Sequence, residues 1–202
     1  MPTDHPATAT RRRLLIACGG EGLLVAIAAA LAWGFGLTMW SDLAPAGRVA
    51  QAIGIGVVAT GPMVLFLLWM LRSGWRPMAS LREMVGKTVG RLLEGAPTWA
   101  LLVLAVMAGV GEELLFRGAL QPLAIHWLEP LVGDAAGWAG VALVALLFGL
   151  AHPMSRMYIV VATIGGLYLG ALAYLSNELL SAVVAHSLYD VVALVWLNGD
   201  DE

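Results

Sequence analysis

An apolar stretch of the chain, residues 99–110, leads directly into two carboxylates and an arginine, Glu112, Glu113 and Arg117. In a membrane helix each of these charges costs roughly 2.5–3.5 kcal/mol to insert, so their presence indicates function. Glu113 and Arg117 are four residues apart and can pair on one face of a helix. Glu112 lies about 100° round the helix from Glu113. The pattern predicts that arginine holds one carboxylate and leaves the other free for chemistry.

Histidines mark two further apolar stretches. His152 ends one of them and shares a helix face with Phe148, while His186 precedes Asp190 by four residues in the other. One member of the His186/Asp190 pair can therefore orient the other. A carboxylate beside a histidine can polarise a water for attack on a carbonyl, and a second histidine can donate to the oxyanion. Three such groups on separate helices indicate a shared intramembrane site.

Other hydrolytic motifs are absent from the sequence. It contains no Gly-x-Ser-x-Gly and no His-Glu-x-x-His, and its one cysteine, Cys18, is remote from the polar groups. A single cysteine also excludes an intramolecular disulfide and a cysteine-based metal site. The residues present suit peptide hydrolysis in or near the membrane by an activated water. Zinc remains an alternative cofactor, with Glu112, His152 and His186 as ligands and a water in the fourth position.

The composition predicts an all-α integral membrane protein. The 202 residues are 60% hydrophobic and 12% charged, with a mean hydropathy of +0.83, whereas soluble domains are about a quarter charged. Apolar runs of roughly 20 residues predict about six spans. Five are at 14–39, 51–71, 135–152, 157–175 and 179–197, and the third span begins after Pro97 and carries Glu112, Glu113 and Arg117. Turn residues after Arg117 predict a loop there: Pro122, Glu129, Pro130, Gly133 and Asp134.

Between the second and third spans, basic residues alternate with apolar ones. Residues 72–95 repeat apolar side chains at three- and four-residue steps, which predicts an amphipathic helix in the cytoplasmic membrane interface; a solvated loop helix is the alternative. We therefore divide the single membrane domain into a two-span region with this basic linker, residues 1–95, and a four-span core, residues 96–198.

The basic residues also predict the orientation of the chain. With the amino terminus inside, nine fall in cytoplasmic segments: Arg11, Arg12, Arg13, Arg72, Arg76, Arg82, Lys87, Arg91 and Arg156. Only Arg48 falls in the opposite loops when Arg117, within a span, is set aside. The positive-inside rule then places both termini in the cytoplasm. The Ala/Gly/Leu-rich composition favours a bacterial inner membrane, with membrane lipids as partners. No basic patch with interleaved aromatic residues suggests nucleic acid.

Two features of the sequence leave alternatives open. Glu21 interrupts the first span, and either lines a polar cavity or lies near the interface or pairs with a neighbour. By the predicted span limits, Glu112 and His152 lie at different depths. They can meet only if the third helix extends toward Ala124 or the fourth continues past Pro153.

Three motifs in order, Glu112-Glu113-x-x-x-Arg117, Phe148-x-x-x-His152 and His186-x-x-x-Asp190, resemble those of a protease family. It is the CAAX-protease and bacteriocin-processing (CPBP) family of intramembrane proteases, also called type II CAAX prenyl endopeptidases or the Abi family. The resemblance covers roughly residues 97–197. It implies that Glu112 and His152 activate the water, and that His186 and the residue at position 190, here Asp190, stabilise the oxyanion. It also implies that Glu113 and Arg117, with Phe148, support the site.

One departure from the family concerns Asp190, where the eukaryotic branch typically carries asparagine. A carboxylate donates to an oxyanion only when protonated, so Asp190 would instead orient His186 or bind a cation. The resemblance implies a membrane-presented substrate, either a prenylated CAAX-like protein or a bacteriocin-type leader peptide. Metalloprotease and metal-free glutamate mechanisms both fit the family. The alternatives from other classes are a non-proteolytic immunity protein or scaffold and a proton-coupled transporter.

Overall fold

The computed structural model describes residues 6–38, 43 and 47–199, and no strand occurs among them. The predicted all-α fold is confirmed. Its elements are α1 (Pro6–Phe35), α3 (Val49–Arg72), α4 (Arg76–Leu93), α5 (Thr98–Glu113), the π-helical η1 (Leu114–Leu120), α6 (Gln121–Val132), the 3₁₀ turn η2 (Gly133–Ala135), α7 (Ala136–Leu150), α8 (Arg156–Ser176) and α9 (Leu180–Gly199). The predicted end of the first span at Met39 and the side chain of Arg91 lie outside the described residues.

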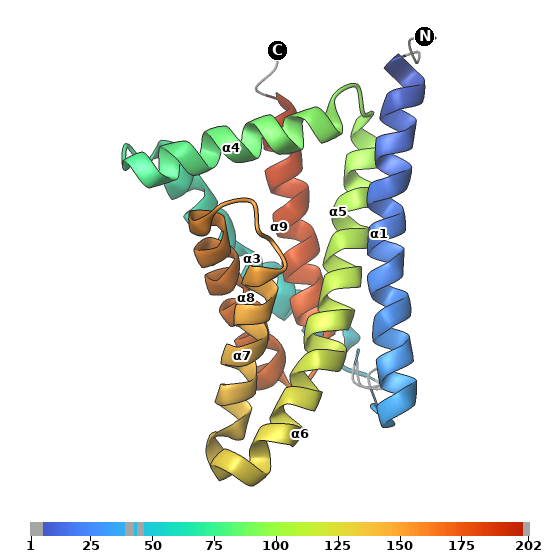
Figure 1. The fold of residues 1–202 in the computed structure, drawn as a ribbon, viewed down its shortest axis with the longest axis vertical. Coiled ribbons are helices and arrows are strands. Elements are labelled where there is room, and N and C mark those ends of the chain that lie inside the picture. Colours follow the sequence, from blue (N-terminus) through green and yellow to red (C-terminus); the bar gives the residue numbers. More distant parts are fainter. Residues whose placement is uncertain (1–5, 39–42, 44–46, 200–202) are drawn as a thin grey trace.

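Long apolar helices make this a multi-pass membrane protein. Four described stretches are long and apolar enough to cross a membrane, namely Thr8–Phe35, Val49–Arg72, Thr98–Leu150 and Arg156–Ser176, and Leu180–Trp196 is a shorter apolar helix. The stretch Thr98–Leu150 includes the predicted third span and the predicted fourth span as far as Leu150, and it reverses direction between α6 and α7 (Figure 1). The total of six spans remains a prediction, as does the division at residue 95.

The loop predicted after Arg117 is wrong, because the chain stays helical to Val132. Within η1, the N–H of Gln121 donates to the carbonyl of Phe116, five residues back. This wider turn accommodates the ring of Pro122, which would clash with the carbonyls of a regular α-helix. The chain turns only at Gly133, which has a φ of 55° and so adopts a conformation that glycine tolerates best.

The basic segment forms α4, which lies across one end of the bundle (Figure 1). Its apolar face packs on α3 through Met78 and Leu81, while the side chains of Lys87 and Glu83 form an exposed ion pair of 2.5 Å. The start of α1 is tied to the same end by Arg13, whose Nη2 donates to the carbonyl of Glu94 at 2.8 Å. The amphipathic helix is therefore present, and its position in the cytoplasmic interface remains a prediction.

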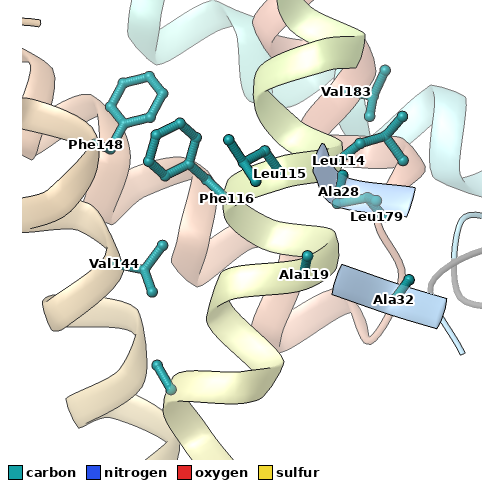
Figure 2. Packing of buried hydrophobic residues seen from close by; sticks show 11 residues of the cluster. Ala28, Ala32, Leu114, Leu115, Phe116, Ala119, Val144, Phe148, Leu179 and Val183 are labelled. Carbon is teal, nitrogen blue, oxygen red and sulfur yellow. The ribbon is translucent and has the colours of Figure 1, made fainter. Parts of the chain in front are cut away.

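The π-helical turn is the centre of the largest apolar core. Its buried side chains pack between α1, α7 and α9, as Figure 2 shows, and Phe116 meets Phe148 edge-on with ring centroids 5.0 Å apart. The buried members are Ala28, Ala32, Leu114, Leu115, Phe116, Ala119, Ala124, Val144, Phe148, Leu179 and Val183. This core fixes the segment that follows Glu112 and Glu113 against three other helices.

Candidate active site

Close approach of α5 and α9 brings the acidic pair to a histidine. Glu112 and Glu113 are the last two residues of α5, and His186 lies on α9. A Cβ added to Gly109 would lie only 2.8 Å from the backbone nitrogen of Ser187 and 2.9 Å from its Cα. Any residue larger than glycine would therefore separate these helices, as at the small-residue contacts of other membrane bundles.

The side chain of Glu112 lies between two imidazoles. Its Oε1 is 3.6 Å from Nε2 of His152, and its Oε2 is 3.9 Å from Nε2 of His186. His152 belongs to the short connection between α7 and α8, and its Nδ1 donates to the carbonyl of Phe148 at 2.8 Å. That bond turns Nε2 toward Glu112. Partial burial lowers the pKa of His152, but the neighbouring Glu112 carboxylate raises it by more, so this pKa lies above its usual range.

Glu113 forms a buried link between Arg117 and His186. Its Oε1 accepts a hydrogen bond of 2.8 Å from Nη1 of Arg117 and lies 2.8 Å from Nδ1 of His186. Glu113 and the side chain of Arg117 are fully buried. The pairing of Glu113 with Arg117 agrees with the sequence interpretation. The contact with His186, 73 residues away, had no sequence signal.

Asp190 lies beside the outer face of the His186 ring. Its Oδ2 is 3.6 Å from Nε2 of His186, which is too long for a hydrogen bond. The ring is oriented instead by the hydrogen bond that its other nitrogen, Nδ1, donates to Glu113. Asp190 and Nε2 of His186 therefore both remain available to a reacting group.

Two side-chain donors fasten α8 to η1 and to the start of α6. Nη2 of Arg117 donates to the carbonyl of Gly166 at 3.0 Å, and Nε2 of Gln121 donates to the carbonyl of Gly170 at 3.1 Å. The guanidinium of Arg117 also lies 4.6 Å from the centroid of the Phe148 ring, within the range of a cation–π contact. Phe148 thus supports the site through its ring as well as through its carbonyl.

All seven predicted site residues converge, so the question of depth is answered. The third helix extends beyond Arg117, and α7 then returns to the level of Glu112 and ends at Leu150. The first of the two alternatives for bringing Glu112 to His152 is therefore correct. Among the residues that the structure describes, no set of three or more His, Cys, Asp or Glu side chains is arranged to hold a metal ion. We derive no step through a metal.

A cavity of about 350 Å³ adjoins the cluster, with Glu112, His152, His186 and Asp190 in its lining. The rest of its wall is largely apolar and comes from α3 and α8, with tyrosines from α8 and α9: Pro62, Met63, Phe66, Val161, Ile164, Tyr158, Tyr168 and Tyr189. The sequence analysis missed the contribution of α3. The one available signal was Pro62, a proline in the middle of an apolar helix.

The fold and the cluster define a helical membrane protein with a buried acid–histidine site beside a largely apolar cavity. Residues 94–192 match the sequence model of the family described as type II CAAX prenyl endopeptidase Rce1-like. This part of the chain belongs to that family of CAAX-type intramembrane proteases, and the resemblance stated from the motifs is confirmed. No curated protein and no solved structure matches the chain. All seven predicted site residues lie within the matched stretch, whereas α1 and α3 lie outside it.

Proposed function

We propose that the protein is an intramembrane endopeptidase in which Glu112 and His152 activate a water to hydrolyse a membrane-presented peptide bond. The observation that supports this most directly is the convergence of Glu112, His152 and His186 at the cavity wall. They come from α5, from the connection after α7 and from α9, yet Glu112 lies within 3.6 Å and 3.9 Å of the two imidazoles. Family membership supports the same reaction class.

In the proposed reaction, Glu112 is the general base. Its carboxylate accepts a proton from a water that His152 helps to orient, and the oxygen of that water forms a bond to the scissile carbonyl carbon. The proton taken up by Glu112 then passes to the leaving amine as the carbon–nitrogen bond breaks. Protonated His186, fixed through Nδ1 by Glu113, donates from Nε2 to the oxyanion. Asp190 faces the same nitrogen, and its carboxylate stabilises the protonated imidazole.

The cavity supports a substrate with an apolar segment next to the scissile bond. Its polar groups come from the cluster, whereas Met63, Phe66, Val161 and Ile164 supply apolar wall. A prenylated CAAX-like protein and a hydrophobic bacteriocin-type leader peptide both have this character. We propose a bacterial inner membrane because of the Ala/Gly/Leu-rich composition. We propose that both termini lie in the cytoplasm, because the start of α1 and the end of α9 lie at the same end of the bundle as the basic helix α4 (Figure 1).

The arrangement favours hydrolysis over the two other functions considered. A proton relay needs ionisable groups spaced through the membrane, whereas the groups here meet around Glu112. A scaffold or immunity protein needs no carboxylate between two imidazoles. We therefore expect cleavage to depend on Glu112 and any binding role to survive its replacement.

Cleavage by the purified protein in liposomes tests this function. The substrates are a farnesylated CAAX peptide and an unprenylated leader-type peptide, each with a fluorescence reporter. Glu112→Gln should lower kcat by about 10²–10⁴-fold, the usual effect of losing a general base. The matched control is Glu129→Gln, because Glu129 is an exposed carboxylate on α6 outside the cluster. Wild-type kcat in Glu112→Gln would refute the proposed function. Cleavage that persists after chelator treatment would exclude a zinc-dependent reaction.

A further inference from the structure

A fourth acidic side chain reaches the cluster from outside the family-matched region. Glu21 lies on α1, which packs along α5 and η1 (Figure 1). A Cβ added to Gly111 would lie 2.9 Å from the carbonyl oxygen of Glu21 and 3.0 Å from its Oε2. Glycine next to Glu112 therefore lets α1 and the Glu21 carboxyl group approach. Glu21 interacts electrostatically with Glu112 and Asp190, although it is not among the residues that line the cavity.

The charges of the enlarged cluster do not balance. It contains four carboxyl groups, one guanidinium and two imidazoles: Glu21, Glu112, Glu113, Asp190, Arg117, His152 and His186. Even with both imidazoles protonated, four negative charges face three positive ones. An uncompensated charge buried in a membrane protein is costly. The cluster therefore holds at least one additional proton on a carboxyl group.

Glu21 is the carboxyl group that lacks a basic partner. Glu112 lies 3.6 Å from His152, Glu113 lies 2.8 Å from Arg117, and Asp190 lies 3.6 Å from His186. Within the described part of the chain, Glu21 forms no such ion pair, and its buried Oε2 has no hydrogen-bond partner. A proton is least costly to hold at this position, because the other three carboxyl groups each lie within 4 Å of a basic side chain and Glu21 does not.

We propose that Glu21 is a positioning residue of the active site, a protonated carboxyl group that holds the additional proton and sets the charge and orientation of Glu112. When protonated, the Glu21 oxygen that has no partner in this structure can donate a hydrogen bond, whereas a second carboxylate would repel the general base. Glu21 can thus favour an ionised, correctly turned Glu112 without adding a negative charge. This inference rests on the proposed protease function, since it concerns the base of that reaction.

A purely structural role predicts a different behaviour for Glu21. A buried carboxyl group without a partner destabilises a membrane helix, and an apolar residue of similar volume usually restores stability. If Glu21 served only packing, Glu21→Leu would raise the melting temperature and leave kcat unchanged. A positioning residue should instead combine a higher melting temperature with a lower kcat, because functional sites retain groups that cost stability.

The test compares Glu21→Leu, Glu21→Gln and Glu112→Gln in the full-length protein in liposomes. Measurements are kcat and KM for the farnesylated and unprenylated reporter peptides, and thermal unfolding in detergent. We expect Glu21→Leu to lose at least about tenfold in kcat, as misplacement of a reacting group does, with KM unchanged. Glu21→Gln retains the size and a donor, so it should stay within about threefold of wild type because the geometry is kept. Glu129→Leu controls for removing an acidic side chain elsewhere.

The outcomes distinguish a failure of the proposed role of Glu21 from a failure of the proposed protease function. A Glu21→Leu protein that cleaves at the wild-type rate overturns the role of Glu21, while an inactive Glu112→Gln in the same experiment preserves the protease function. A Glu21→Gln protein as slow as Glu21→Leu overturns the neutral-donor role. If Glu112→Gln cleaves normally, the proposed function itself fails, whatever the Glu21 variants do.

Discussion

Gly109→Ala should uncouple the histidine of α9 from the acidic pair of α5. The new Cβ would lie 2.8 Å from the backbone nitrogen of Ser187, against an ordinary contact of at least 3.4 Å. Because the obstacle is backbone, a side-chain rotation cannot relieve it, and the helices must separate by about 0.6 Å. The bond from Nδ1 of His186 to Glu113 would then lengthen from 2.8 Å to about 3.4 Å, beyond good hydrogen-bond geometry.

The expected loss follows from that displacement. A misplacement of about 1 Å costs on the order of 10²-fold in rate, so kcat should fall by about tenfold to a hundredfold. Overpacking should lower the free energy of unfolding by about 1–3 kcal/mol. Peptide cleavage in liposomes and thermal unfolding in detergent measure both effects. Gly54→Ala is the matched control, since a Cβ there meets nothing within 4 Å. Gly109→Ala protein that folds and cleaves at the wild-type rate would refute the reasoning.

Three further predictions address the support of the site, the orientation of His152 and the cavity wall. Arg117→Met should destabilise the protein by about 3–5 kcal/mol in thermal unfolding, because it leaves Glu113 buried without the guanidinium that pairs with it. Adding Glu113→Met should recover stability but not cleavage. Recovered cleavage would contradict the role of Glu113. His152→Phe keeps the ring but removes Nε2, so kcat should fall by about 10²-fold or more in the peptide assay, and an unchanged kcat would exclude His152 from water activation. Met63→Trp should narrow the cavity and raise KM for the farnesylated peptide by about tenfold, the value of one or two lost methylene contacts. An equal rise in KM for a short unprenylated peptide would show that α3 does not select the substrate.

The sequence was sufficient to predict the long apolar helices and seven residues that meet in the candidate site, because both depend on local chemistry. Apolar runs predicted the spans, and the four-residue step from Glu113 to Arg117 predicted their ion pair. The contact between Glu113 and His186 could not be predicted, because the side-chain geometry depends on how closely α5 and α9 pack at Gly109. The helical course after Arg117 was hidden by Pro122, whose ring the π-helical turn accommodates. The α3 wall of the cavity was invisible for a similar reason, since an apolar helix carries no sign of which neighbour it faces.

The two donors that fasten α8 to η1 and to the start of α6 affect how the substrate selectivity of such a protein can change. Arg117 and Gln121 bind main-chain carbonyls, those of Gly166 and Gly170, so this attachment needs no particular side chain from α8 beyond room for close approach. Val161 and Ile164 of the same helix line the cavity. Substitutions there can reshape the space for a substrate while the helix keeps its register against the reacting groups. Selectivity and chemistry can in this way change separately in the course of evolution, although a single helix serves both.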